Sequence, residues 1–155
     1  MRKEQIIIID IDGVLSNPKH RIKHAINKDW DKFNDLMEFD EPNLEMFTLL
    51  HYFMLNFKVV FLTARPEHYR QTTLKWLMAN SPNSILLKTK IAKKESELIM
   101  RPFENKDSSE IFKEKILKEL KNKFQIILAI DDNWKVVKMF RENGINALEQ
   151  KSMYY

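Results

Sequence analysis

The fold is decided by one stretch, residues 5–15, which reads QIIIIDIDGVL. Its apolar, mostly β-branched run is typical of a strand that is buried on both faces at the centre of a parallel sheet. The run ends in two carboxylates, Asp10 and Asp12, which lie two residues apart and therefore project to the same side of an extended chain. Because open α/β sheets bind ligands at the carboxyl ends of their strands, this strand end is a candidate site.

The two acids can be interpreted in two ways. Neighbouring carboxylates repel each other unless a cation or a shared proton compensates, and Mg²⁺ prefers carboxylate oxygens and often holds phosphate as well. The alternative is a strand end whose acids are solvated in a turn. Gly13 follows directly, and a glycine here indicates unusual dihedral angles or a close approach of the backbone to a ligand.

Length and composition are those of a globular domain. The chain has 155 residues, of which 44% are hydrophobic and 31% charged, so we expect one domain, residues 1–155, with a full core. No apolar run approaches the roughly 20 residues that span a bilayer, and the first strand leaves no room for a signal peptide. With no cysteine, disulfides and thiolate chemistry are excluded. We therefore expect a cytoplasmic protein that does not bind membranes.

The charge balance is mildly basic, with a formal net charge of +4 and a pI of about 9.2. Lysines gather in residues 19–28, 88–94 and 113–123. Such an excess suits a phosphate-rich partner such as nucleic acid. The same lysines could instead solvate helix faces, so the charge supports a nucleic-acid substrate without establishing one.

Strands and helices alternate along the chain. Strands are expected at residues 57–62, 85–87, 124–130 and 145–148, and residues 98–100 could form another. Helices are expected at residues 31–39, 43–56, 67–80, 107–122 (with Asp107 and Glu110 as a capping pair) and around 136–140. This order predicts an α/β fold with a doubly wound, three-layer parallel sheet of about five strands.

The segment between the first strand and its helix, residues 16–42, is far longer than the usual 2–6 residues of such a link. We interpret it as a small cap insertion beside the acid pair, where insertions act as lids or specificity elements. Trp30 in this insertion either stacks on a base or fills the insertion's own small core. Trp76 and Trp134 are interpreted as structural.

Two further strands end in chemically capable residues. Thr63 follows the second buried strand, and Asp131 and Asp132 follow the strand at 124–130. The ends of parallel strands lie on one edge, so one pocket can hold them all. Lys113 stands in the first turns of its helix, where the helix dipole disfavours a cation, and it would supply charge for a phosphate. Acids, a lysine, a hydroxyl and Mg²⁺ make a phosphoryl-transfer site, although Thr63 could instead be a local cap.

Four ordered motifs resemble those of the haloacid-dehalogenase-like (HAD-like) phosphatases: residues 10–15 (DIDGVL), 61–66 (FLTARP), Lys113 and the pair Asp131-Asp132. The chain is more closely similar to the 3′-phosphatase domain of phage polynucleotide kinase. That resemblance rests on residues 98–102 (LIMRP), 112–116 (FKEKI), 128–132 (LAIDD) and 136–141 (VVKMFR). The sequence has no glycine-rich phosphate loop, so no kinase half is expected.

The resemblance implies roles for the acids. Asp10 would be the nucleophile that forms an aspartyl-phosphate, and Asp12 would protonate the leaving oxygen and then activate water. The Asp10 carboxylate, the Asp12 backbone carbonyl and Asp132 would hold Mg²⁺, with Asp131 as a supporting or alternative ligand.

It also implies roles around the phosphate. Thr63 and Lys113 would bind the transferring phosphoryl oxygens. Arg21 and Arg65 fall where the family carries arginines; they could grip a substrate phosphate or be surface residues.

The resemblance also implies Gly13 and Ala64 as neighbouring substrate-binding positions. The chain departs from the family at Ala64, where glycine is favoured, at Asn133, where arginine is usual, and at Ser109, where an acid is common.

The leading hypothesis is a Mg²⁺-dependent phosphatase that removes a 3′-phosphate from nucleic-acid ends before ligation, because a small insertion leaves the site open to a strand end. A 5′(3′)-nucleotidase or a small-metabolite phosphatase is the alternative. A phospho-accepting, receiver-like signalling domain is a remote one, since receivers place the acid pair after the first strand. A nucleic-acid binder without catalysis would not need Asp12.

Overall fold

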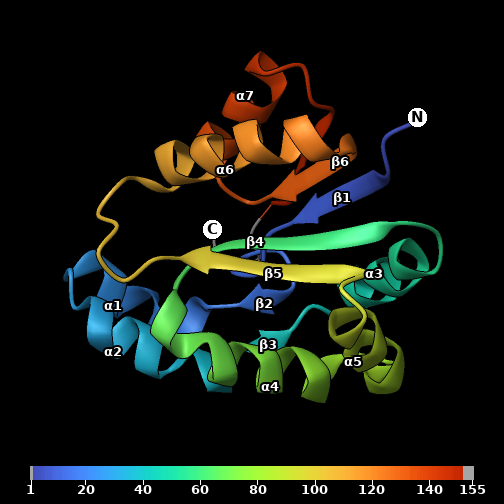
Figure 1. Cartoon of the computed structure of the whole chain (residues 1–155). Coiled ribbons are helices and arrows are strands. Elements are labelled where there is room, and N and C mark those ends of the chain that lie inside the picture. The colour runs from blue at the N-terminus through green and yellow to red at the C-terminus, as the bar shows by residue number, and fades with distance from the viewer. Residues whose placement is uncertain (1, 152–155) are drawn as a thin grey trace.

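A five-stranded parallel sheet forms the centre of the molecule (Figure 1). The computed structural model describes residues 2–151. The strands lie in the order β5-β4-β1-β6-β7, and every neighbouring pair is parallel. Their bounds are Gln5–Ile9 (β1), Lys58–Pro66 (β4), Ser96–Arg101 (β5), Gln125–Asp131 (β6) and Ala147–Glu149 (β7). The isoleucine run is therefore the central strand, as expected from its burial on both faces.

Helices cover both faces of the sheet. One face carries α6 (Ser109–Lys123) and α7 (Trp134–Glu142), and the other carries α3 (Leu44–Asn56), α4 (Arg70–Asn80) and α5 (Ser84–Ala92) (Figure 1). Along β1, Ile6 and Ile8 belong to the core under α6 and α7, whereas Ile9 belongs to the core on the α3 and α4 side. The predicted doubly wound, three-layer α/β fold is confirmed. None of the described helices is long and apolar enough to cross a membrane.

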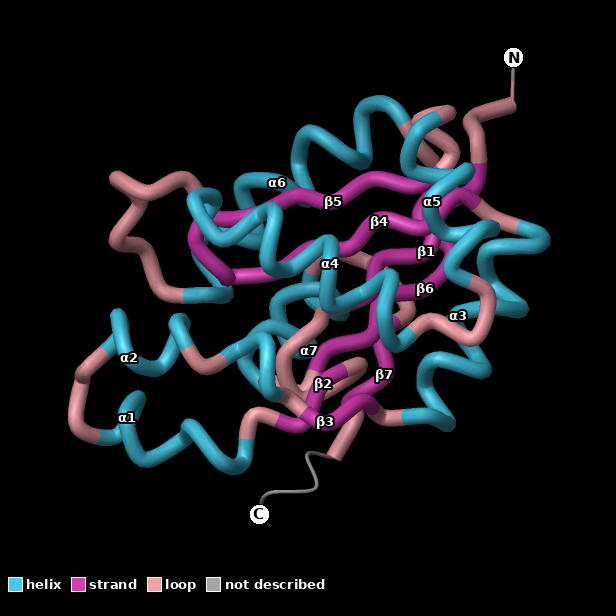
Figure 2. The backbone as a smooth tube through the Cα atoms, turned by 90° about the horizontal axis from the view of Figure 1, so that it is seen from below, coloured by secondary structure: helices cyan, strands magenta, loops and turns pink. Residues whose placement is uncertain are grey.

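Residues 16–42 form a layer of short elements beyond the sheet. Strand β2 (Ser16–Asn17) pairs antiparallel with β3 (Glu41–Pro42), and this ribbon closes the segment at its base. Between them lie the 3₁₀ helix η1 (Lys19–Arg21), α1 (Ile22–Ile26), α2 (Trp30–Asp35) and the 3₁₀ helix η2 (Met37–Phe39). Figure 2 shows α1 and α2 side by side, projecting past the strands.

The single helix expected at residues 31–39 is wrong. Helix α2 ends at Asp35, and the tighter turn η2 follows. That turn buries Met37 in the interior and leads into Asp40, whose side chain is also buried. A helix that continued to residue 39 would move Met37 and Asp40 away from their buried positions. Tertiary packing therefore overrides the helical spacing here.

The strand expected at residues 85–87 is wrong, because these residues belong to α5. The Asn83 side chain accepts a hydrogen bond from the Leu86 backbone N–H, which caps that helix. Leu87 is buried while Ile85 is 78% exposed, a one-sided pattern that a short apolar run cannot reveal. The missing strand is β5, which contains the alternative stretch 98–100.

Two boundaries also differ from expectation. Helix α6 begins at Ser109 with Ser108 as its N-cap, so the Asp107 and Glu110 capping pair is wrong. The Asp107 carboxylate instead accepts hydrogen bonds from Asn105 and Lys115. Strand β4 continues to Pro66, with a register shift against β5 after Leu62, so Thr63 and Arg65 lie within its last residues rather than beyond it.

Candidate active site

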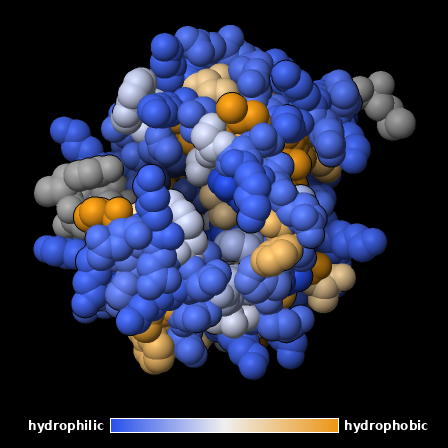
Figure 3. Space-filling model, turned by 90° about the vertical axis from the view of Figure 1, so that its left-hand side faces the viewer, coloured by the Kyte–Doolittle hydropathy of each residue, from blue (hydrophilic) through white to orange (hydrophobic). Residues whose placement is uncertain are grey.

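The carboxyl ends of the strands meet at one cleft. The strands run toward the left in Figure 1, and Figure 3 looks onto that edge, where a hollow opens in a mostly hydrophilic face. The cleft has a volume of about 990 Å³. All six predicted acid, hydroxyl and lysine residues line it: Asp10, Asp12, Thr63, Lys113, Asp131 and Asp132. The structure therefore brings together side chains that are more than a hundred residues apart in the chain.

A buried lysine joins two of the acids. Asp10 follows Ile9 and points to the α6 side of the sheet, where the Lys113 ammonium lies 3.1 Å from its Oδ1 and 2.7 Å from Oδ2 of Asp131. Burial alone would lower the pKa of Lys113, but the carboxylates of Asp10 and Asp131 outweigh it and raise that pKa above its usual value. The two carboxylates thus favour the charged form of Lys113 beside Asp10.

Burial has the opposite effect on Asp10. It raises the pKa of Asp10 well above the usual range, Lys113 counteracts this, and the negative charges of Asp131 and Asp132 raise it further. The Asp10 carboxylate thus lies in a site with more negative than positive charge. A bound cation would relieve that excess and favour the ionised, nucleophilic form.

The donor set fits a divalent cation. Carboxylate oxygens of Asp10, Asp131 and Asp132 lie within 4.8 Å of one another. Oδ1 of Asp10 is buried and accepts no hydrogen bond from a described residue, although Lys113 lies close to it. An all-oxygen group whose buried Asp10 Oδ1 has, among residues 2–151, only the Lys113 ammonium as an ion-pair partner suits Mg²⁺. The orientation of Asp131 is fixed in part by the Asn133 backbone N–H, which donates to its Oδ1 at 3.0 Å.

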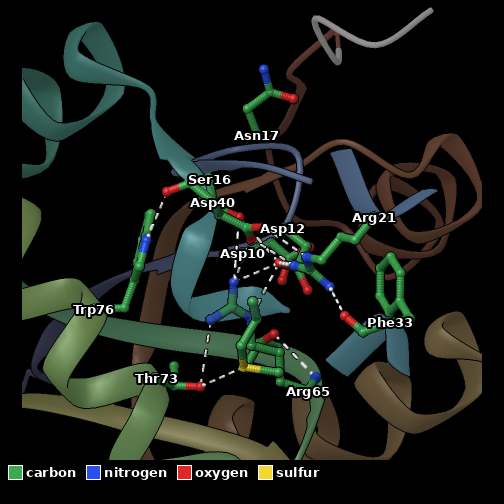
Figure 4. A network of polar contacts seen from close by, with 12 residues as sticks. Asp10, Asp12, Ser16, Asn17, Arg21, Phe33, Asp40, Arg65, Thr73 and Trp76 are labelled. Atoms are coloured by element: carbon green, nitrogen blue, oxygen red, sulfur yellow. Dashed lines mark hydrogen bonds and ion pairs between the residues drawn. The ribbon is translucent and has the colours of Figure 1, made fainter. Parts of the chain in front are cut away.

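Asp12 is held by two arginines (Figure 4). Its Oδ1 accepts hydrogen bonds from Nη2 of Arg21 at 2.6 Å and from Nη2 of Arg65 at 2.7 Å. The Ser16 hydroxyl donates to the same oxygen at 3.1 Å. Burial alone would raise the pKa of Asp12, but Arg65 and Arg21 outweigh it and hold that pKa well below its usual range. Asp12 is ionised in this arrangement.

Asp40, which was not predicted from the sequence, accepts hydrogen bonds from both arginines that contact Asp12. Its carboxylate accepts two hydrogen bonds from Arg21, at 2.7 and 2.6 Å, and one from Arg65 at 3.1 Å. A ring nitrogen of His20 lies 3.0 Å from Oδ1. Two carboxylates and two guanidinium groups thus form a charge-balanced cluster that ties the insertion to β4 (Figure 4).

Asp40 can be inferred only from the burial of Arg21 and Arg65, which the sequence does not show. Two buried arginines need more than one counter-charge, because an uncompensated buried charge is strongly destabilising. The interpretation of Arg21 and Arg65 as surface residues is wrong, since both side chains are fully buried. Once their burial is known, a second acid in the insertion becomes necessary.

Of the remaining predicted positions, Thr63 and Ala64 line the cleft and Gly13 lies in the turn after β1. Thr63 is buried at the cleft, where its hydroxyl oxygen accepts the Arg65 backbone N–H at 3.2 Å, so it also has the local role considered as the alternative. Ala64 lines the cleft. Gly13 is buried in the turn after β1 with a φ of 79°, which confirms the expected unusual dihedral angle.

The tryptophans differ from expectation in two places. Trp30 does not fill a core: it is 56% exposed at the cleft, with its ring edge-on to Phe33 at 5.9 Å between centroids. Trp134 also lines the cleft, 59% exposed, so its structural interpretation is wrong. Trp76 is buried and donates its indole N–H to the Asp40 backbone carbonyl at 2.9 Å, which agrees with a structural role.

Comparison with known proteins gives one family and several solved structures with the same fold. The family model described as "Polynucleotide kinase PNKP phosphatase domain" matches residues 4–153. A search of curated proteins found no match. The structure is similar to a chain from the Pnkp1/Rnl/Hen1 RNA repair complex, with a TM-score of 0.72 and 23% identity over 95% of this chain and 42% of that chain.

Two further structures share the fold. One is a class C acid phosphatase from Bacillus anthracis with tungstate bound, with a TM-score of 0.62 and 14% identity over 100% of this chain and 69% of that chain. The other is a HAD family enzyme from Bacteroides thetaiotaomicron in complex with magnesium and inorganic phosphate, with a TM-score of 0.57 and 16% identity over 97% and 96%. The chain spans less than half the length of its RNA-repair neighbour.

Proposed function

The chain belongs to the family of the polynucleotide kinase PNKP phosphatase domain, and on that premise we propose that this phosphatase removes 3′-phosphates from nucleic-acid ends. The observation that carries the proposal is the Asp10, Lys113 and Asp131 group at the strand ends, beside Asp12 with its two arginines. The net charge of +4 supports a polyanionic substrate. The similarity to a chain of an RNA repair complex supports a nucleic-acid end in particular.

The first half-reaction would transfer the phosphoryl group to the enzyme. The Asp10 carboxylate attacks phosphorus, the bond between phosphorus and the 3′-oxygen breaks, and Asp12 gives a proton to that oxygen. Asp12 is ionised in the free site, so it would first take up a proton from solvent as the anionic substrate phosphate binds beside it, because neighbouring negative charge favours the protonated form of a carboxyl group. That proton is the one it passes to the 3′-oxygen. Lys113 and Thr63 would stabilise the charge on the transferring oxygens.

The second half-reaction would hydrolyse the aspartyl-phosphate and restore the free Asp10 carboxylate. Water attacks the phosphorus of the aspartyl-phosphate, Asp12 takes up the water proton, and the bond between phosphorus and the Asp10 oxygen breaks to release inorganic phosphate. Asp10, Asp131, Asp132 and the Asp12 backbone carbonyl are the groups proposed to hold Mg²⁺. When bound, Mg²⁺ would neutralise charge on the phosphoryl oxygens and on the acids. We further propose the cytoplasm as the setting.

A substrate comparison tests the proposal. Phosphate release in Mg²⁺ would be measured from 3′-phosphorylated DNA and RNA oligonucleotides, and from free 3′- and 5′-mononucleotides, with Asp10→Asn as the inactive control. We expect a strong preference for an oligonucleotide, with activity at background in the variant. Equal or better turnover of mononucleotides would replace the proposal with a nucleotidase. Absence of turnover of every substrate would refute a phosphatase of this class.

A further inference from the structure

Exposed aromatic rings converge on the active-site cleft. Among residues 2–151, five large aromatic side chains are exposed: Trp30, Phe39, Tyr52, Phe103 and Trp134. Three of them, Trp30, Phe103 and Trp134, line the cleft, and they come from three separate segments of the chain. Large apolar rings cost free energy when they are solvated, so their gathering at a single polar site points to a ligand with an apolar face.

Phe103 is the most exposed of the three, at 63%, and follows the end of β5. The ring of His68, from the 3₁₀ helix η3 (Glu67–Tyr69), contacts it nearly perpendicularly, with 5.1 Å between centroids and 76° between planes. The ammonium group of Lys106 lies 5.7 Å from the Phe103 centroid. His68 and Lys106 line the same cleft as the catalytic acids. A flat ring and a cation thus stand together beside the phosphoryl site.

We propose that Phe103, His68 and Lys106 form a nucleotide subsite: the 3′-terminal base stacks on Phe103, and Lys106 pairs with the next phosphodiester. The inference rests on the proposed function, because it takes the terminal phosphate to lie at Asp10. Stacking on an aromatic ring tolerates any base, since every base has a π-face. Lys106 forms no ion pair with a described residue, so its charge is available to the strand.

The proposal has a structural consequence for the substrate. At a nick, both faces of the 3′-terminal base are covered by stacked neighbours, so the base must leave that stack before it can stack on Phe103. The enzyme should therefore act on single-stranded or frayed 3′ ends faster than on 3′ ends at a nick. Phe103 is 63% exposed, so its contacts with His68 and Lys106 leave much of its side chain open to a ligand.

A double-perturbation cycle tests the subsite: the ring is removed by mutation of Phe103, and the base is removed by use of an abasic substrate. Phe103→Ala and wild type would be assayed on a single-stranded 3′-phosphorylated oligonucleotide, and on the same strand with an abasic 3′-terminal nucleotide. We expect the variant to lower kcat/KM about 5- to 150-fold on the intact strand, the range of one base-stacking contact. On the abasic strand the change should be less than about twofold, and Phe103→Trp should retain wild-type activity.

Matched controls separate the subsite from general effects. Tyr52→Ala removes an aromatic side chain that is 60% exposed on α3, outside the cleft, and should change neither rate. Lys106→Gln should weaken binding of the oligonucleotide and reduce its salt slope by roughly 0.7, with no effect on a mononucleotide. An equal loss on intact and abasic strands, or no loss on either, would overturn the inference.

Failure of the proposed function would look different. If wild type prefers mononucleotides to oligonucleotides, end healing fails. In that case Phe103→Ala would be compared on a 3′-nucleotide and on deoxyribose 3-phosphate. A loss confined to the nucleotide would uphold stacking on Phe103, and equal rates would overturn it.

Discussion

Asp40 offers the sharpest test of how the arginines are held. Asp40→Asn keeps the shape of the side chain but removes its charge, so the buried groups of Arg21 and Arg65 share Asp12 as their remaining carboxylate partner in the cluster. Breaking a buried ion pair by removing one partner costs about 3–5 kcal/mol. The asparagine oxygen can still accept one of the hydrogen bonds, so we expect a loss near the lower end, about 3 kcal/mol.

The loss of unfolding free energy would be measured by urea unfolding, with tryptophan fluorescence as the probe. The values of kcat and KM for a 3′-phosphorylated oligonucleotide would be measured alongside. Because the free energy of unfolding of a domain is about 5–15 kcal/mol, the variant should still fold. Its kcat should fall, since the guanidinium groups beside Asp12 are no longer fixed. Asp35→Asn, at an exposed residue of the same insertion that accepts from the Tyr69 hydroxyl, is the matched control and should change stability by less than about 1 kcal/mol. Equal effects of the two substitutions would refute a central role for Asp40.

Two other predictions concern charge at the acids. The pKa of Asp12 is lowered in the folded state, so its contribution to stability is present above the usual aspartate pKa of about 3.9 and is lost as the pH falls below it. The free energy of unfolding should therefore fall more steeply with decreasing pH for wild type than for Asp12→Asn. Equal slopes would contradict this. Mg²⁺ should raise the unfolding free energy by about 2.7 kcal/mol at a concentration of 100 times its Kd. Asp132→Asn should lose most of that gain, as measured by thermal unfolding with and without EDTA, whereas an unchanged gain would place the ion elsewhere.

The central strand and the acids could be predicted because their signals are local. The isoleucine run is β-branched as well as apolar and is followed by turn residues, which together favour a strand buried on both faces, and the acids sit at fixed positions after it. Lys113 could be predicted chiefly from the motif resemblance, because its place near a helix N-terminus is a minor signal when the dipole effect falls off within the first turn. Its carboxylate partners in the structure are Asp10 and Asp131.

What could not be predicted depends on contacts between distant segments. Asp40 acquires its role from Arg65 on β4, 25 residues away, and from Arg21, which lies across an insertion whose short elements leave little periodic pattern. Residues 85–87 are too short an apolar run to distinguish a strand from one face of a helix. The exposure of Trp30 and Trp134 follows from where the cleft lies, which no spacing in the sequence records.

The most direct test of the account follows the phosphate itself. An oligonucleotide carrying a ³²P-labelled 3′-phosphate would be mixed with the enzyme and Mg²⁺, quenched in acid within one turnover, and the protein reduced with borohydride, which converts an aspartyl-phosphate to homoserine. We expect transient label on the protein and homoserine at position 10, with neither in Asp10→Asn. Release of labelled phosphate without any label on the protein at any time would contradict Asp10 as the nucleophile.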